Sequence, residues 1–452
     1  MRKRDRCKHL SINQTFGRAT GILEGDFAQS HDFEKGATNQ PSLRDWEWRL
    51  PRLGAEVFDV TLCCGRYSIM EVIKMSSRRS HLRPFRSWSA ATVVAVGMLL
   101  PQTGLAGGRT GDVYVLTNQP TGNAVMVFHR DAAGMLTFSG KFATGGKGTG
   151  TGPDPLGSQG ALVLNCDNRL LFAVNAGSNS ISVLAVSADR LTLLNTVFSH
   201  GIEPVSLTAR DNLVYVLNAG GTPNISGFQI EAATNHLVPL SGSTQNLPGG
   251  AGAAPAEVAF SSDGNALVVT EKATNRIDTF TLDDHGVAQP GASFPSSGKT
   301  PFGFAFDHEN TAIVSDAGSG PGTSAASSYE VDDDGNLEVI TPAVGDTQTA
   351  ACWLVIARNG RFAYTSNTGS NTISSYSVSE GGSLALLNVT AASTGSGSTP
   401  IDMALSENGR FLYVRNGGNG TISGFRVQVD GSLTAVASAS GVPAGAQGVA
   451  AR

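Results

Sequence analysis

One phrase of aromatic and β-branched residues recurs along the chain in seven degenerate copies. Its clearest form is GRFLYVRNGGNGTISGF (409–425). The other copies occupy residues 111–128, 168–184, 211–228, 264–280, 310–329 and 360–376. Between Asn118 in the first copy and Asn416 in the last, the repeat averages about 50 residues, a period typical of propeller blades. The repeat therefore predicts an all-β fold, a seven-bladed β-propeller.

Each copy predicts four strands. In the last copy they are TPIDMALS (399–406), FLYVRN (411–416), TISGFRV (421–427) and the weaker SLTAV (432–436). The runs are short and rich in Val, Tyr, Phe and Ile, and Asn-Gly or Asp-Gly pairs between runs are typical of hairpins. Such a sheet is apolar on both faces and needs a neighbour on each side. A ring of blades supplies both neighbours and leaves few open sheet edges.

The two ends of the propeller sequence predict how the ring closes. The first copy begins directly at its second strand. The chain ends with GAQGVAA (445–451), which resembles GSQGALV (157–163), the opening strand of the second copy. We therefore expect the C-terminal strand to become the innermost strand of blade one. The glycine-rich string GGKGTGTG (145–152) between these copies is interpreted as a flexible connector.

Charge divides the chain near residue 108. Residues 1–108 hold 16 of the 32 Lys and Arg but only 10 of the 37 Asp and Glu, so residues 109–452, the predicted propeller, are acidic. Nucleic acids and anionic membranes demand clustered cations, and neither is an expected partner. We expect a monomer with no stable membrane insertion.

Residues 75–106 predict an export signal peptide. Arg78 and Arg79 belong to a basic start, an apolar run of eleven residues covers 90–100, and small residues suited to cleavage follow at 104–106. Eleven residues are too few for a membrane span, which needs about 20. The basic start resembles a twin-arginine signal, and ordinary secretion remains the alternative. Either route predicts a periplasmic or secreted protein.

Residues 1–74 precede this signal and show no apolar periodicity. A secretion signal in mid-chain could hardly act, so we interpret this segment as an upstream extension from a misassigned start codon. The alternative is a genuine disordered N-terminal region.

The propeller contains two cysteines, Cys166 on blade two and Cys352 on blade six. These blades are not adjacent, so we expect no disulfide between them. The propeller also lacks CxxC or His-rich spacing, which argues against a structural zinc site.

Functional side chains are expected where the loops converge on the axis. Antiparallel pairing places the start of each first strand and the end of each second strand on one face, which we name the upper face. The Asp-Gly and Asn-Gly hairpins lie on the opposite, lower face and read as simple turns. The residues that end the second strands are five amides and two carboxylates: Asn118, Asn175, Asn218, Asn367, Asn416, Glu271 and Asp316.

An amide at this position can cap the following turn, which gives the asparagines a structural alternative. Glu is a poor turn former, so Glu271, followed by Lys272, is the first catalytic candidate. Arg415 is the third, because it can bind a carboxylate, although alternation can also aim it between blades. The predicted substrate-binding residues are Glu203, Glu257, Asp316, Cys352, Trp353, Asn367, Asp402, Asn416 and Gln447.

Two of these residues have explicit structural alternatives. Trp353 is the only tryptophan of the propeller and can stack on a planar ligand, or else pack between blades. Asp402 follows Pro400 near the axis and can instead accept a hydrogen bond from a neighbouring blade's backbone.

The blade phrase, the count of seven and residues 109–452 as a whole resemble the lactonase-type propellers. That family includes bacterial 6-phosphogluconolactonase and the fungal enzyme that interconverts carboxymuconate and its lactone. The resemblance implies lactone hydrolysis or formation, with Arg and His on innermost strands and a Glu ending a second strand. Glu271 matches that Glu. Where the basic partners are expected, this chain has Ala256, Glu257, Cys352 and Trp353, and the nearest histidine is His200 in a loop.

This departure shapes the expected chemistry. Lactone opening needs a base for water and a positive charge or donors for the oxyanion. Glu271 is the predicted base, and Lys272 or Arg415 the electrophilic partner. An acidic tunnel mouth repels phosphorylated lactones, so the expected substrate is a neutral or weakly charged lactone or its precursor.

Two other classes of function stay open. Upper-face carboxylates, namely Glu257, Glu271, Asp316 and Asp402, can together bind Ca²⁺, either structurally or in a metal-dependent lactonase. Alternatively, the chain is a non-catalytic exported propeller that binds a protein or a saccharide. No other cofactor is expected.

We predict that protein translated from Met75 is exported and cut near Ala106, because the basic and apolar segments then lie at the N-terminus. N-terminal sequencing of the mature protein measures this. Mature protein that retains residues 1–74 would contradict the start-site interpretation.

Overall fold

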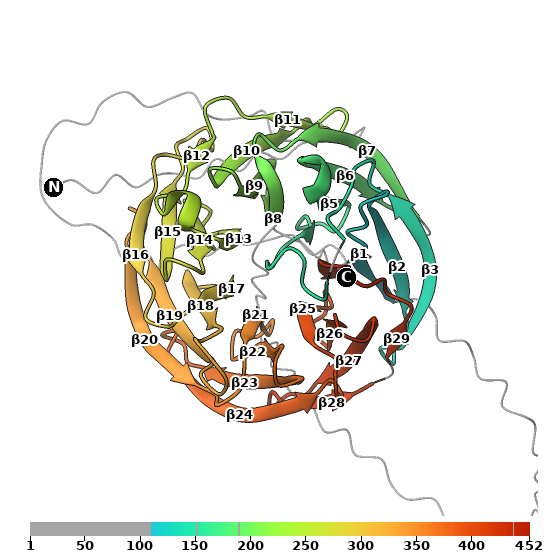
Figure 1. Ribbon diagram of the computed structural model, residues 1–452, viewed down its shortest axis with the longest axis vertical. Coiled ribbons are helices and arrows are strands. Elements are labelled where there is room, and N and C mark those ends of the chain that lie inside the picture. The colour runs from blue at the N-terminus through green and yellow to red at the C-terminus, as the bar shows by residue number, and fades with distance from the viewer. Residues whose placement is uncertain (1–109, 151, 189, 437) are drawn as a thin grey trace, which may run out of the picture. The chain divides into compact units, whose positions relative to one another are not determined.

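The computed structural model describes residues 110–452, apart from residues 151, 189 and 437. The predicted extension, 1–74, and the predicted signal, 75–106, lie outside the described residues. The described residues form seven antiparallel sheets arranged as blades around an axis (Figure 1). The predicted seven-bladed β-propeller is therefore confirmed.

The first four blades each place their strands in order from the axis outward. Blade one contains β30 (Val449–Ala451), β1 (Gly111–Leu116), β2 (Ala124–Arg130) and β3 (Leu136–Ala143). Blade two contains β4 (Leu162–Leu164), β5 (Leu170–Asn175), β6 (Ser180–Val186) and β7 (Leu191–Phe198). Blade three contains β8 (Ile202–Arg210), β9 (Leu213–Gly220), β10 (Asn224–Ile230) and β11 (Leu237–Pro239), with β12 (Gln245–Asn246) also paired to β10. Blade four contains β13 (Pro255–Phe260), β14 (Ala266–Glu271), β15 (Arg276–Thr281) and β16 (Ala292–Pro295).

The remaining three blades follow the same order. Blade five contains β17 (Pro301–Phe306), β18 (Thr311–Asp316), β19 (Ala325–Val331) and β20 (Leu337–Gly345). Blade six contains β21 (Ala351–Ile356), β22 (Phe362–Asn367), β23 (Thr372–Val378) and β24 (Leu384–Ser393). Blade seven contains β25 (Pro400–Leu405), β26 (Phe411–Asn416), β27 (Thr421–Val427) and β28 (Leu433–Ala435), with β29 (Ala439–Ser440) also paired to β27. Two short 3₁₀ turns, η1 (Ala176–Ser178) and η2 (Gly250–Gly252), occur in the connections.

Burial follows the position of each strand in its blade. All six residues of β5, β14, β18, β22 and β26, the second strands, are buried. The outermost strands are much more exposed; in β3, for example, every residue is exposed or half-exposed. Second strands are covered on both faces by neighbouring blades, which explains their nearly continuous apolar sequence. Within the described residues, no helix has the length and apolar character that a membrane span requires.

The ring closes as the sequence predicts. β30 pairs antiparallel with β1, so the C-terminal strand becomes the innermost strand of blade one. The side chain of Arg452 reinforces this closure, since its Nη2 lies 2.6 Å from Oδ2 of the buried Asp112. His129 contacts the other oxygen of Asp112 at 2.8 Å. In return, the Arg452 carbonyl accepts a hydrogen bond of 3.1 Å from Arg130.

The connection between blades one and two enters the axis of the ring. We call residues 153–159, PDPLGSQ, the plug segment. Its last side chain, Gln159, donates to the carbonyls of Phe304 and Leu354 and accepts from the Leu354 backbone N–H at 2.9 Å. The Gln159 N–H donates to Ala256. One residue thus joins the innermost strands of blades four, five and six.

Gly146 and Gly148 of the glycine-rich string before the plug segment are closely packed, which corrects the interpretation of these glycines as a flexible connector. A Cβ at Gly146 would lie 2.3 Å from the Asn175 side chain, and one at Gly148 would lie 2.1 Å from the Asn118 backbone. Glycine is therefore required for the close approach of this connection to the second-strand ends of blades one and two.

We predict that Arg452→Ala lowers the free energy of unfolding by about 1–3 kcal/mol, because the buried Asp112 loses its cationic partner. Chemical denaturation measures the change. Arg169→Ala, an exposed arginine on blade two, is the control and should change stability by less than about 0.5 kcal/mol. Equal losses for the two variants would show that Arg452 does not secure the ring.

We predict that Gln159→Ala costs about 2–3 kcal/mol, because the buried Leu354 N–H and its neighbouring carbonyls lose their partner. The matched control is Gln289→Ala, since the exposed side chain of Gln289 donates to a carbonyl two residues away. If the two alanine variants unfold at the same denaturant concentration, the plug segment does not tie the blades together.

Candidate functional site

The predicted site residues fall into three regions of the propeller. One group surrounds the plug segment on the upper side of the axis. A second group lines a cavity on its lower side. The third group is buried within the blades. Glu271, Lys272 and Arg415, the predicted catalytic residues, are divided between the first and third groups.

Lys272 and Arg415 contact the plug segment. The Lys272 ammonium donates to the Gly157 carbonyl and lies over the Phe302 ring, 4.8 Å from its centre. Arg415 donates to the Pro153 carbonyl at 2.8 Å. Burial lowers the pKa of Lys272 and also lowers the pKa of Arg415, to about 10. The donors of both cations are thus directed at backbone carbonyls.

Asp154 of the plug segment lies within electrostatic range of both cations. Burial raises the pKa of Asp154, while the charges of Lys272 and Arg415 oppose that rise. The half-buried Glu203 also acts on Lys272 and favours its charged form. Asp154 was not among the predicted site residues. Its only distinguishing feature in the sequence is that no other carboxylate occurs between Asp131 and Asp167.

Three further predicted residues lie around the plug segment. Trp353 is fully buried, its indole N–H donates to the Ser158 carbonyl at 2.9 Å, and its ring packs 5.0 Å from that of Phe302. Gln447 accepts from the Leu156 N–H and donates to Ser158. Burial raises the pKa of Cys352 to about 12. Trp353 therefore has the packing role that is its structural alternative.

The second-strand ends are buried, and in blades five, six and seven their side chains bond within the blade. Asn367 donates to Thr372 and Ser374, and Asn416 donates to Thr421 and Ser423, at distances of 2.8–3.1 Å. These amides therefore fasten the second strand to the third, a structural role that differs from the expected capping of the following turn. Asp316 accepts from Ser327 at 2.8 Å, and burial raises its pKa to about 7.

Glu271 belongs to this buried group. Its side chain is 0% exposed. Its Oε1 accepts from the Gly249 N–H at 3.0 Å, and its Oε2 accepts from the Thr274 hydroxyl at 2.5 Å. A Cβ at Gly249 would meet Oε2 at 2.1 Å, so the preceding loop is seated directly on this carboxylate. Glu271 and Lys272 are adjacent in sequence, but their side chains bind different partners.

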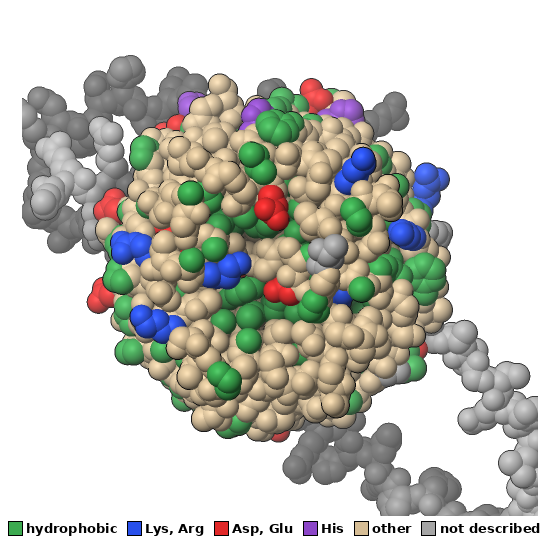
Figure 2. Space-filling view, in the orientation of Figure 1, with side chains coloured by type: hydrophobic (Ala, Val, Ile, Leu, Met, Phe, Trp, Pro, Cys, Tyr) green, Lys and Arg blue, Asp and Glu red, His purple; other side chains and the backbone are tan. Residues whose placement is uncertain are grey.

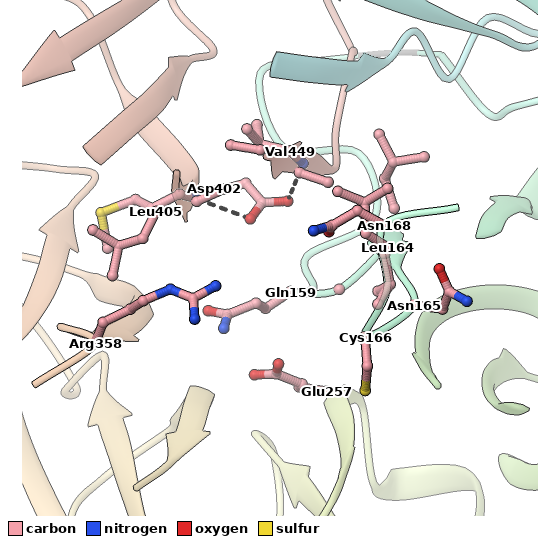
Figure 3. Close-up of a pocket in the computed structure, with 17 residues that line it drawn as sticks. Gln159, Leu164, Asn165, Cys166, Asn168, Glu257, Arg358, Asp402, Leu405 and Val449 are labelled. Carbon is pink, nitrogen blue, oxygen red and sulfur yellow. Dashed lines mark hydrogen bonds between the residues drawn. The ribbon is translucent and has the colours of Figure 1, made fainter. Parts of the chain in front are cut away.

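A cavity of about 350 Å³ lies on the lower side of the plug segment. Glu257, Asp402 and Gln159 lie deep in it and are buried, whereas Arg358 is exposed at its rim. The close-up shows the Arg358 guanidinium directed toward Gln159, with Glu257 and Asp402 on either side of that glutamine (Figure 3). The rim also includes Asn165, Cys166 and Asn168. The cavity therefore opens at the face where the sequence predicts simple turns.

Both carboxyls of this cavity bond to the neighbouring blade. The Phe304 N–H donates to Glu257 at 2.6 Å, and the Val449 N–H donates to Asp402 at 3.1 Å. Asp402 thus makes the interblade bond that is its structural alternative. Asp402 also has a φ of 58°, a left-handed conformation that few non-glycine residues adopt and that often accompanies functional sites.

The cavity changes the acidity of its two carboxyls. Burial raises the pKa of Asp402 to about 7, against the opposing effects of its backbone donors and of Arg415. Burial also raises the pKa of Glu257 well above its ordinary value, and the charge of Asp402 adds to this rise. The raised pKa of Glu257 favours its protonated form, whereas a pKa of about 7 gives Asp402 access to its ionised form near neutral pH. Such a pair can supply a proton donor and a proton acceptor.

Arg358 and Gln159 are site residues that sequence reasoning missed. Arg358 occupies the second position of the turn between β21 and β22, where blade seven has Glu407 and blade two has Cys166. Gln159 lies at the opening of the predicted first strand of blade two. A Cβ at Gly303 would lie 2.1 Å from its Oε1, so a glycine on blade five accommodates it.

The described residues contain no group of three or more His, Cys, Asp or Glu arranged to hold a metal ion. The predicted Ca²⁺ ligands are accordingly separated, with Glu257 and Asp402 at the cavity and Glu271 and Asp316 inside blades four and five. Cys166 and Cys352 are not joined by a disulfide.

The face turned to the viewer in Figure 1 is mostly neutral. Figure 2 shows scattered acidic and basic side chains there and a central hollow that contains hydrophobic side chains.

Comparisons with known proteins agree with this fold. Residues 327–447 match the family model described as lactonase, 7-bladed beta-propeller. A protein from Lactobacillus plantarum is 18% identical, with a TM-score of 0.61, over 76% of this chain and 99% of its own. The periplasmic gluconolactonase of Pseudomonas aeruginosa is 18% identical, with a TM-score of 0.58, over 75% of this chain and 98% of its own.

A candidate 6-phosphogluconolactonase from Bacteroides fragilis is 17% identical, with a TM-score of 0.58, over 76% of this chain and 98% of its own. None of the curated protein sequences matches the chain. The resemblance to lactonase-type seven-bladed β-propellers is therefore confirmed, by sequence over residues 327–447 and by fold over the described propeller.

Proposed function

We propose that this chain is a lactonase that opens a small, neutral or weakly charged lactone in the lower axial cavity. One observation carries the proposal: two buried carboxyls with raised pKa values face the same cavity, and an arginine lies at its rim. Perturbed acids in a concave pocket are typical of catalytic sites. The family resemblance supplies the class of reaction.

The arrangement supports hydrolysis by general acid and base catalysis. Ionised Asp402 takes a proton from water, and the hydroxide adds to the lactone carbonyl carbon. Arg358 and protonated Glu257 donate to the oxyanion that forms. Glu257 then donates its proton to the ring oxygen as the acyl–oxygen bond breaks, and a hydroxy acid is released. The proton that Asp402 took from water returns to Glu257, which restores both carboxyls. Each Asp402 oxygen keeps a lone pair beyond its backbone bond.

The upper cluster around Asp154 is the second location for this chemistry. Lys272 and Arg415, the cations predicted for it, already bond to the plug segment, so a ligand there must displace carbonyls of Gly157 and Pro153. The lower cavity needs no such displacement, which is why we favour it. If the chain is a binding module, no acid is released from any lactone. If it is a Ca²⁺-dependent lactonase, EDTA inhibits acid release.

We also propose that the protein is exported. The support is the basic and apolar pattern of residues 75–106, together with the lactonase-type fold shared with a periplasmic gluconolactonase. N-terminal sequencing of the mature protein tests the chain's own compartment.

We predict that Asp402→Asn lowers kcat/KM for neutral small-ring lactones by about 100-fold or more, because the base is lost. Glu257→Gln should also lower it. In the wild type, activity should rise with pH through about 7, since Asp402 must be ionised to act as a base. Acid release followed in a pH-stat gives both the rate and the profile.

The matched control is Asp346→Asn, which alters another fully buried carboxyl but lies outside the cavity lining. It should leave kcat/KM within about twofold of the wild type. Lys272→Met separates the two locations, because it removes a cation of the upper cluster only. Full activity in Asp402→Asn with loss in Lys272→Met would move the active site to the upper cluster. No acid release from any lactone would contradict the enzyme proposal.

A further inference from the structure

The upper ends of blades two, five, six and seven share a side-chain bond. In blades two, six and seven, the asparagine that ends the second strand donates to a serine of the third strand. The bonds Asn175–Ser182, Asn367–Ser374 and Asn416–Ser423 are each 2.8 Å long. Blade five keeps the serine and replaces the amide, with Ser327 donating to Asp316 at 2.8 Å. In every one of these pairs, one partner carries a hydrogen to donate.

Blade four replaces both partners by carboxyls. Glu271 ends β14 and is paired with Arg276, so the residue at the serine position of β15 is Asp278. Both side chains are 0% exposed. No donor of the described residues has hydrogen-bond geometry at the two buried oxygens of Asp278, although the nearby Ser293 hydroxyl lowers the pKa of Asp278 against the larger effect of burial. Glu271 uses its oxygens for the Gly249 N–H and the Thr274 hydroxyl.

Two adjacent buried carboxylates are unstable without a hydrogen between them. A buried polar group without a partner costs about 1–3 kcal/mol, and two like charges at one site cannot both ionise freely. Burial, followed by interaction with Glu271, raises the pKa of Asp278 to about 8. The charged groups that act on Asp278 are Glu271 from β14 and Arg276 from β15; β16 contributes only Ser293. Arg276 is engaged by Ser293 through its Nε and Nη2 atoms.

We propose that Asp278 holds a proton directed at Glu271, and that this carboxyl pair is a pH-sensitive latch for the loop at residues 249–254. The latch acts through Glu271, whose Oε1 holds the Gly249 N–H. The same loop bonds to the turn after β14, since Lys272 and Ala273 donate to the carbonyls of Ala254 and Ala253. When the proton leaves, the two carboxylates repel, and the loop loses its anchor.

The latch has a defined sign with pH. Folded Asp278 binds its proton more tightly than the unfolded chain does, so the stabilising contribution is complete below the pKa of an unfolded Asp, about 4. It is lost progressively as pH rises to about 8 and is absent above that pH. Asparagine at this position carries its own donor and does not titrate.

The test compares melting temperatures of the full-length wild type and Asp278→Asn from pH 5 to pH 9. The melting temperature of Asp278→Asn minus that of the wild type should increase by about 4 °C between pH 5 and pH 8 and should stay constant above pH 8. Hydrogen exchange adds a local readout: protection of the Gly249 amide should fall above pH 8 in the wild type and persist in the variant. A melting difference that is constant with pH would overturn the proposal.

Two further variants keep the test decisive. Glu271→Gln provides a hydrogen-bond donor to Asp278 from β14. Its melting temperature, relative to that of the wild type, should increase with pH in the same way. Glu271→Asn with Asp278→Ser reproduces the pair of blades two, six and seven, and its melting temperature should show the weakest pH dependence. A lower melting temperature of the wild type at pH 8 with EDTA would show that a metal ion, instead of a proton, joins the carboxyls, and would contradict the proposal.

Discussion

The pairing of β30 with β1 is the interaction on which the rest of the propeller depends. Each blade is apolar on both faces and is covered only when its neighbours on both sides are present. Without the C-terminal strand, blade one would lack its innermost strand and the ring would have an open edge. Arg452 and Asp112 add a charged bond at this closure, in a setting where Asp112 is fully buried and Arg452 is partly exposed.

Closure creates an axis, and the plug segment occupies it. The innermost strands present backbone groups toward the axis, and Gln159 satisfies those of blades five and six. The consequence for function is a division into two compartments. On the upper side, the cations Lys272 and Arg415 are bound to plug carbonyls, and on the lower side the carboxyls Glu257 and Asp402 face a cavity.

The fold could be predicted from the sequence because it depends on a repeated local pattern. The second strands are buried on both faces in every blade, so the blade phrase keeps its apolar run, and the final GAQGVAA predicts the closure. The candidate site depends on residues outside the phrase. Gln159 and Asp154 belong to a glycine-rich connection, and Arg358 belongs to a hairpin turn. No strand periodicity indicates that these segments reach the axis.

Neighbouring residues at the second-strand ends direct their side chains to different surroundings, and this limited the prediction of the site. Glu271 and Lys272 are neighbours in sequence, and the sequence suggests a base beside an electrophile. In the structure, Glu271 is buried inside blade four, while Lys272 turns toward the plug segment. The unusual Glu at this position has a different partner, Asp278, which replaces the serine of the other blades. A departure from the repeat was therefore informative, although its partner lay on the next strand.

Among the buried carboxyls with raised pKa values, Asp278 and Asp316 lie inside blades, whereas Asp402 and Glu257 lie at the lower cavity. Asp316 accepts from Ser327 inside blade five and has no contact with the cavity lining, which fits a structural role. Asp402 and Glu257 bond to a neighbouring blade and also line the cavity. A ligand in the cavity can therefore reach these two buried carboxyls. Position relative to the cavity, and not the size of the pKa change, separates the two settings.

The most direct measurement is a crystal structure of the protein with a lactam, which resembles a neutral lactone but resists hydrolysis. Our account predicts lactam density in the lower axial cavity, with its carbonyl oxygen near Arg358 and its ring beside Asp402 and Glu257. Density beside Lys272 and Arg415, with the plug segment displaced, would contradict it.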